Sequence, residues 1–294
     1  MKYLKTSIIT LSLLALVITG LGFYNNQVQA ADDPIQIGYV NWAGTVAETN
    51  VVKAILENKL DLDVQTKMVG AGPVYAALAE GDIDFFLGGW LPMTHKSYVD
   101  KYENEIIKTG VNYLGARIGL VVPDYVDIDS IKELKENKEK FDGEIIGIDP
   151  GAGVMKATRE ALDHYGLDNF KLVSSSGPAM VGSLKKAIQN EEWVVVTGWK
   201  PHYKFARFDL KFLNDPDKIY GETENVYTLH NPKLAQENPK IVTFLHDFRM
   251  DSSQLGEVMG WIAEGMDPEK AGEKWVNENP EIVNDWLTAS SVSE

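Results

Sequence analysis

Two tryptophans end apolar runs of the sequence, and each is closely followed by a proline. Trp90 stands in GGWLP and Trp199 in TGWKPHY. The proline fixes the backbone and lowers the entropy cost of presenting the ring. Aromatic faces suit a quaternary ammonium group, which has no N–H to donate and is held by cation–π attraction of about 0.5–2 kcal/mol per ring. One such tryptophan is more often a packing residue, but the matched pair predicts a pocket for a methylated cation.

A carboxylate site is predicted at NWAGTVA, residues 41–47. This segment follows an apolar run and opens a helix, for which Thr45 is the expected cap. The first N–H groups of a helix lack partners and lie at the positive end of its dipole, which suits a carboxylate. Thr45 and Val46 are the expected donors. Together with the cation pocket, they describe a site for a zwitterion.

The elements that must position these residues alternate between strand and helix. Short β-branched runs such as IQIGYV, IDFFLG and EIIGID are each followed by a loop and a helical segment. Further strands are expected at ARIGLVVP, which starts at Ala116, and at WVVVTGW, and a further helix is expected over 130–137. This pattern predicts an α/β fold. In such folds ligands bind beyond the carboxyl ends of the strands. Four segments that leave a strand for a loop are expected at that edge: NWAGTVA, GGWLPMTH, PGAGVM and TGWKPHY.

The alternation runs twice, which predicts two lobes with a hinge between them. We expect residues 31–118 to form the first part of lobe 1, residues 119–212 to form lobe 2, and residues 213–294 to complete lobe 1 with a mostly helical tail. No low-complexity linker separates the sets, so the hinge is expected in strand segments at 117–122 and 211–213. Trp261, Trp275 and Trp286 occupy apolar positions of the tail and are predicted to be core residues.

Signatures of catalysis, metals and cofactors are missing from the sequence. It has no GxxxxGK[ST], HExxH or GxSxG motif, and no cysteine. The histidines are scattered without the spacing of metal ligands: His95, His164, His202, His230 and His246. The formal net charge of −15 repels phosphate backbones and argues against a nucleic-acid partner. We therefore predict no enzyme, no metal and no cofactor.

Residues 1–30 are typical of an export signal. Lys2 and Lys5 precede an apolar stretch at 8–22, and Val28-Gln29-Ala30 matches a cleavage pattern. That stretch is short for a membrane span, which needs about 20 apolar residues. We predict cleavage after Ala30, with an uncleaved anchor as the alternative. Without a cysteine no lipid anchor of the lipobox kind is available, so another means of retention is needed.

Long segments of the chain resemble the glycine-betaine/proline-betaine binding proteins of ABC importers, the OpuAC type. They are GYVNWA, GDIDFFLGGWLPMTHKSY, FDGEIIGIDPGAGVM, PAMVGSLKKA, VVVTGWKPHYKFARFDLKFLNDP and QLGEVM. The resemblance implies a two-lobe, type II periplasmic-binding-protein fold that holds its ligand in the cleft between the lobes. It also implies a membrane permease and an ATPase as partners, and a location at the extracellular face of the cell membrane or in the periplasm.

The resemblance also implies roles for particular residues. In that family three aromatic side chains, usually tryptophans, surround the trimethylammonium group, while backbone amides and a polar side chain hold the carboxylate. Trp90 matches the first tryptophan, in GGWLP. The second motif commonly reads GWKPHW in relatives, and here Trp199 is kept while Tyr203 stands at the later position, so the ring that faces the ligand is either Trp199 or Tyr203. The amides from Gly44 to Val46 match the carboxylate segment. The remaining candidates for the cleft are Trp42, His95 and His202.

The chain departs from the family near its C-terminus. Relatives carry Phe-His-Trp where this chain reads Phe248-Arg249-Met250. Met250 would then be the third wall, because a thioether is polarisable although it lacks the ring quadrupole. Arg249 would either pair with the ligand carboxylate or point to solvent. The ligand is therefore expected to be glycine betaine, held more weakly, or carnitine, proline betaine or a sulfonium analogue.

Two other functions fit the same fold. An enzyme would need an acid–base pair in the cleft, for example His95 or His202 beside a carboxylate. A surface receptor would use the same ligand site but pass a signal to a partner in place of delivering the ligand to a permease.

Overall fold

A computed structural model describes residues 33–289, and the described residues from Pro34 onward form one compact unit. The predicted export signal lies outside the described residues. The described strands join in the order β2-β1-β3-β9-β4-β7-β5-β6, with β8 paired to β4. Their bounds are β1 Ile35–Tyr39, β2 Val64–Met68, β3 Phe85–Leu91, β4 Ile107–Pro123, β5 Glu144–Ile146, β6 Lys171–Val173, β7 Val196–Lys200, β8 Leu210–Phe212 and β9 Glu224–His230.

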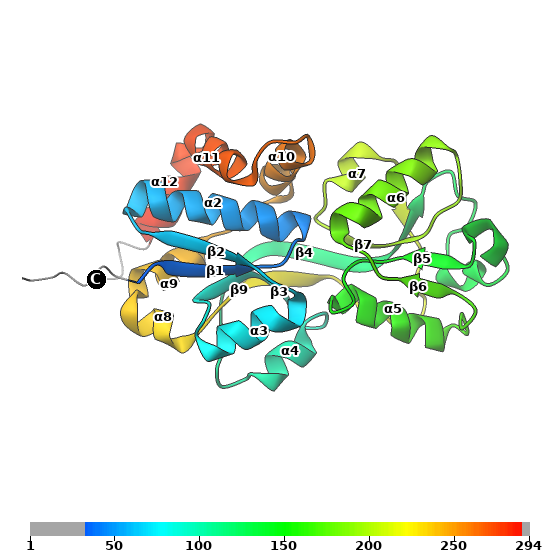
Figure 1. Ribbon diagram of the computed structural model, residues 1–294, viewed down its shortest axis with the longest axis horizontal. Helices are drawn as coiled ribbons and strands as arrows, with labels where there is room; N and C mark the ends of the chain where they lie inside the picture. Colours follow the sequence, from blue (N-terminus) through cyan, green and yellow to red (C-terminus); the bar gives the residue numbers. More distant parts are fainter. Residues whose placement is uncertain (1–32, 290–294) are drawn as a thin grey trace, which may run out of the picture. The chain divides into compact units, whose positions relative to one another are not determined.

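Helices lie on both faces of this sheet (Figure 1). The α-helices are α2 Ala43–Leu60, α3 Ala71–Glu80, α4 Lys96–Lys101, α5 Gly153–His164, α6 Gly177–Gln189, α7 Lys204–Arg207, α8 Pro232–Glu237, α9 Pro239–Asp247, α10 Ser252–Ala263, α11 Pro268–Glu278 and α12 Pro280–Ala289. Two 3₁₀ turns, η1 Ile131–Leu134 and η2 Lys138–Phe141, follow β4. No helix within 33–289 is long and apolar enough to cross a membrane.

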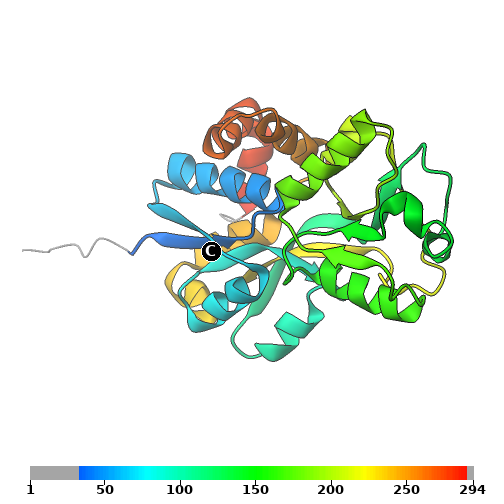
Figure 2. The ribbon, with the colours of Figure 1, turned by 45° about the vertical axis from the view of Figure 1, so that its right-hand side comes forward.

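The strands fall into two groups that share β4. In the first lobe β1 runs parallel to β2 and β3, while β9 pairs antiparallel with β3 and with the first part of β4. In the second lobe β5 runs parallel to β6 and β7, and the second part of β4 pairs antiparallel with β7 and β8. Figures 1 and 2 show the two lobes side by side with β4 passing through both.

The chain crosses between the lobes within β4 and again between β8 and β9. On β4, Ala116 still pairs with Glu224 of β9, and Arg117 already pairs with Lys200 of β7. The two-lobe α/β architecture agrees with the predicted fold, and the lobe boundaries at 118 and 212 stay predictions.

The apolar faces of the first lobe explain its packing. Every residue of β3 is buried, as expected of a strand covered on both sides. Helix α2 packs against α11, where Gly272 lets the two backbones approach, because a Cβ there would lie 2.3 Å from the Asn50 carbonyl oxygen. In the tail, Trp275 and Trp286 are buried and stacked with centroids 5.8 Å apart, which confirms them as core. Trp261 is only half-buried.

Some predicted elements differ from the structure. The strand expected from Ala116 begins nine residues earlier, at Ile107. The helix expected over 130–137 is the short turn η1 capped by Ser130, because only Ile131 and Leu134 are apolar enough to be buried there. The predicted cap at Thr45 is wrong, since α2 begins at Ala43 and has no side-chain cap.

Candidate ligand cavity between the lobes

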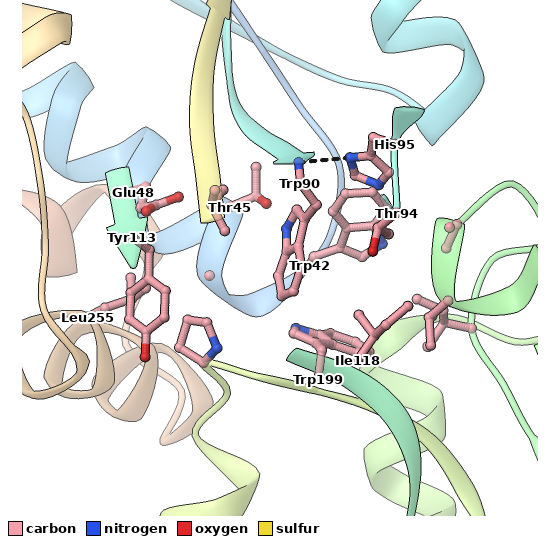
Figure 3. Close-up of a pocket in the computed structure, with 17 residues that line it drawn as sticks. Trp42, Thr45, Glu48, Trp90, Thr94, His95, Tyr113, Ile118, Trp199 and Leu255 are labelled. Carbon is pink, nitrogen blue, oxygen red and sulfur yellow. Dashed lines mark hydrogen bonds between the residues drawn. The ribbon is translucent and has the colours of Figure 1, made fainter. Parts of the chain in front are cut away.

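One cavity is lined by residues of both lobes (Figure 3). Its empty space amounts to about 540 Å³ when the part open to solvent is counted. Among the residues that the structure describes, no lysine or arginine lines it. The lining residues are Trp42, Gly44, Thr45, Glu48, Trp90, Thr94, His95, Tyr113, Ile118, Ile148, Ala152, Gly153, Val154, Trp199, Pro201, Val226 and Leu255.

Three tryptophans of this lining come from three different elements. Trp42 immediately precedes α2, Trp90 lies on β3, and Trp199 lies on β7. Their exposed fractions are 7%, 8% and 4%, so each ring is fixed by its surroundings and still reaches the cavity. Trp90 and Trp199 lie where the sequence predicted an aromatic pocket. Trp42 supplies a third ring, which the sequence suggested only as an additional cleft residue.

Trp42 is bound to the second lobe. Its indole N–H donates to Asp149 Oδ2 at 3.0 Å, and its ring stacks on His95 with centroids 5.5 Å apart. A second hydrogen bond also runs from the first lobe to the second, because the Tyr98 hydroxyl donates to the Gly151 carbonyl at 2.8 Å. These contacts hold the lobes together around the cavity.

His95 is a neutral positioning group. It is 1% exposed, and its Nδ1 accepts the backbone N–H of Trp90 at 3.1 Å. Burial lowers the pKa of His95 to about 3, so the imidazole carries no charge at neutral pH. The ring therefore fixes Trp90 and Trp42 without placing a cation beside a ligand.

Two helix N-termini open into the cavity, one from each lobe. In α2 the N–H of Val46 donates to the Trp42 carbonyl at 2.9 Å, so Gly44 and Thr45 carry the amides without an intrahelical partner. In α5 the N–H of Met155 already donates to the Ala152 carbonyl. The amides of Gly153 and Val154, which precede Met155 in α5, therefore have no intrahelical partner, and both residues line the cavity.

Gly153 makes close contact with the opposite lobe. A Cβ on this residue would lie 2.5 Å from the Thr94 carbonyl oxygen and 2.3 Å from its Cγ2. Only a glycine therefore lets the start of α5 approach the loop after β3. The sequence drew attention to this segment as the exit PGAGVM but did not assign it a role.

Glu48 is an acidic side chain that the sequence analysis missed. It lines the cavity from α2, is 3% exposed, and its Oε1 has no hydrogen-bond partner within 33–289. Burial raises the pKa of its carboxyl well above the usual value. The spacing could have indicated it, because Glu48 follows Gly44 by four residues and Thr45 by three and therefore lies on the same face of the helix.

Other predicted residues lie outside this cavity. Val46, His202 and Tyr203 line a second pocket, together with Asn41, Ala43, Gly177, Pro178, Met259, Ile262 and Ala263. Met250 is 1% exposed in the core, and its N–H donates to the Asn112 carbonyl at 2.9 Å. Arg249 is exposed and donates to the Val111 carbonyl at 3.1 Å. These five residues therefore lie outside the lining of the cavity that holds the three tryptophans.

A buried lysine lies behind Trp199. Lys204 is fully buried, its Nζ lies 4.3 Å from the Trp199 ring centroid, and that nitrogen has no hydrogen-bond partner within 33–289. Burial lowers its pKa well below the usual value. The neighbouring His202 is held neutral in the same way, by burial and then by Lys204. Neither group lines the cavity itself. Within 33–289 no cluster of acidic and histidine side chains could hold a metal ion.

Two α/β lobes joined by shared strands, with an aromatic cavity between them, define a two-lobe binding-protein fold. The model of the OpuAC family, the substrate binding domain of ABC-type glycine betaine transport systems, matches residues 33–278. The chain belongs to this family, as its motifs predicted.

Relatives of known description agree with this assignment. The glycine betaine/carnitine transport binding protein GbuC of Listeria monocytogenes is 42% identical over 154 residues, which cover 52% of this chain and 51% of that protein. The chain thus matches about half the length of this curated relative. Lactococcal OpuAC, in its closed-liganded conformation complexed with glycine betaine, has a TM-score of 0.82 and 35% identity, covering 87% of this chain and 100% of that one.

A second solved structure is equally similar. The glycine/betaine/L-proline-binding protein ProX of Borrelia burgdorferi has a TM-score of 0.84 and 37% identity, and the match covers 89% of this chain and 100% of that one. These likenesses extend over the whole described fold and confirm its two-lobe class.

Proposed function

We propose that this chain is the solute-binding protein of an ABC importer and captures glycine betaine or a related quaternary-ammonium solute. The observation that carries the proposal is the lining of the cavity. Three tryptophans from both lobes meet there, and no lysine or arginine side chain of the described part of the chain lines it. Such a lining attracts a methylated cation and places no competing positive charge beside it.

The ammonium group is held by Trp42, Trp90 and Trp199. Trp42 takes the place that Met250 would have had, because Met250 is enclosed in the core. The carboxylate of a zwitterion would be bound by helix N-termini, which offer free amides and a positive dipole end. Those of α2 and α5 both open on the cavity, so the predicted donors Gly44 and Thr45 are joined by Gly153 and Val154.

Delivery and location follow from the family. The chain would be exported by its first 30 residues, act at the extracellular face of the membrane or in the periplasm, and pass its ligand to a permease driven by an ATPase. It would catalyse no reaction, since its buried histidines are neutral positioning or packing groups. His95, for example, uses its Nδ1 to hold Trp90.

Calorimetry with the mature protein tests this function. We expect micromolar binding of glycine betaine, weakened about tenfold or more by Trp90→Ala through loss of one cation–π contact and its packing. Trp261→Ala is the matched control, because this half-buried tryptophan of α10 does not line the cavity. Absence of heat with glycine betaine, proline betaine, carnitine and choline at millimolar concentration would refute the proposal.

A further inference from the structure

Glu48 has no task in the site as proposed so far. A zwitterion needs aromatic rings for its ammonium group and amides for its carboxylate, and neither requirement explains a carboxyl in the wall. In the view of Figure 3, Glu48 and Tyr113 lie on one side of the Trp90 ring, while Trp42 and His95 lie on the other. Glu48 and Tyr113 therefore line a part of the cavity separate from Trp42 and His95.

This carboxyl is unsatisfied by the protein. Glu48 Oε1 is buried and has no hydrogen-bond partner within 33–289. Leaving such a group without a partner is costly, so buried polar atoms of this kind usually serve a ligand or an ordered water. Two other polar groups of the lining are already engaged, because the Tyr113 hydroxyl is bonded to Ser252 Oγ at 2.6 Å and His95 Nδ1 accepts from the Trp90 N–H.

No fixed charge holds Glu48 in place either. Burial alone raises its pKa, and no lysine or arginine between residues 33 and 289 lines the cavity. A neutral carboxyl can donate one hydrogen bond and accept another. Its complement is a group that also does both, and on a small quaternary-ammonium compound that group is a hydroxyl.

We propose that Glu48 is a specificity-determining residue that binds a hydroxyl group of the ligand, so that the cavity favours hydroxylated quaternary-ammonium compounds over their deoxy analogues. The inference rests on the proposed function and names the substrate class of the same cavity. Carnitine and choline carry such a hydroxyl, whereas glycine betaine does not. A buried polar group that a ligand leaves unpaired penalises that ligand, which makes a hydroxyl contact an effective discriminator.

Matched ligand pairs isolate the hydroxyl. γ-Butyrobetaine is carnitine without its hydroxyl, and ethyltrimethylammonium is choline without its hydroxyl. We expect the wild-type protein to prefer the hydroxylated member of at least one pair by about tenfold, the value of one net hydrogen bond in a buried site. In Glu48→Leu, which keeps the volume but not the hydrogen bonds, that ratio should fall to near one. Glu48→Gln should retain most of it.

Control variants distinguish failure of the Glu48 proposal from failure of the proposed function. Glu57→Gln lies on the same helix outside the cavity, with a side chain 37% exposed, and should leave every ratio unchanged. Glycine betaine affinity should stay within about threefold in all variants, showing an intact cage. A hydroxyl preference that survives Glu48→Leu, or wild-type protein that binds glycine betaine without preferring either hydroxylated ligand, overturns the inference alone. Failure to bind any betaine overturns the proposed function.

Discussion

Trp42 and Asp149 stand 107 residues apart in the chain and on different lobes, and the indole N–H of one donates to the carboxylate of the other at 3.0 Å. A wall of the cavity is thus held by the lobe opposite to the one that carries it. The full set of three rings is complete only when both lobes are in contact.

Removing the carboxylate should therefore weaken ligand binding without touching the ligand. We expect Asp149→Ala to reduce glycine betaine affinity about fivefold to tenfold, the net value of one hydrogen bond, because Trp42 loses the partner that positions it. Asp149→Asn keeps an acceptor oxygen and should bind nearly as the wild type does. Asp217→Ala, an exposed acid of the same lobe that pairs with His164, is the control. Equal affinities of Asp149→Ala and wild type would show that Trp42 is held by packing alone.

Trp42 and Met250 compete for the role of third wall, and their substitutions separate the two. Trp42→Ala should weaken glycine betaine binding about tenfold or more, because an aromatic face is lost. Met250→Ala should leave affinity within about twofold and lower the free energy of unfolding by about 2–5 kcal/mol, as for other buried methionines. Calorimetry and urea unfolding measure the two quantities. A Met250→Ala protein that is stable but no longer binds would restore Met250 to the site.

His95 should make the fold sensitive to acid. Its pKa is about 3 in the fold against an ordinary 6.5. Between these values the unfolded chain binds a proton that the folded chain does not, so stability falls as pH decreases, at most by about 1.4 kcal/mol per pH unit. The loss begins below pH 6.5 and is complete near pH 3.

Urea unfolding between about pH 7 and pH 4 measures this slope. The readout is the difference between wild type and His95→Asn, because other buried histidines such as His202 titrate in the same sense. Asparagine keeps an acceptor for the Trp90 N–H but cannot take up a proton. The control is His246→Asn, whose side chain is 69% exposed. Parallel slopes for wild type and His95→Asn would mean that His95 is protonated in the fold.

Gly153 should be required for the lobes to close. In Gly153→Ala the new Cβ would meet the Thr94 carbonyl at 2.5 Å, so the lobes must separate. We expect glycine betaine affinity to fall about tenfold or more, with a larger radius of gyration in the presence of ligand by small-angle scattering. Gly182→Ala on α6 meets no atom within 4 Å and should behave as the wild type. Tight binding by Gly153→Ala would show that contact between these segments is not needed.

The sequence was sufficient to predict the α/β alternation, the helical tail and the aromatic pair, because these follow from local periodicity and turn residues. Trp90 and Trp199 each end a buried strand, and strand ends are visible in the sequence. Tyr203 illustrates the limit. It lies only four residues after Trp199, but the chain turns at Pro201 and places it in the second pocket. The direction of a side chain after a turn depends on tertiary packing.

Burial that depends on packing between distant elements could not be predicted. Glu48 reads as an ordinary surface acid in the sequence, but α2 is buried at every position from 45 to 52, because it packs against α10 and α11 as well as against β1, β2 and β3. Met250 was placed by analogy with a motif near the C-terminus. Its burial beside β4 depends on long-range contacts that a motif does not contain.

The continuous strand β4 fixes the spacing of the cavity walls. Tyr113 pairs with Val226, which pairs in turn with Trp90, and Ile118 pairs with Trp199. Tyr113 and Ile118, five residues apart on β4, are thus each tied by strand pairing to a tryptophan wall of a different lobe. The pairing with β9 shifts register between Tyr113 and Ala116, and this irregularity lets Tyr113 and Ile118, an odd number of residues apart, line the same cavity. This short stretch should therefore tolerate substitution of the exposed Leu114, but neither a change in length nor replacement of Gly115, whose φ of +75° favours glycine.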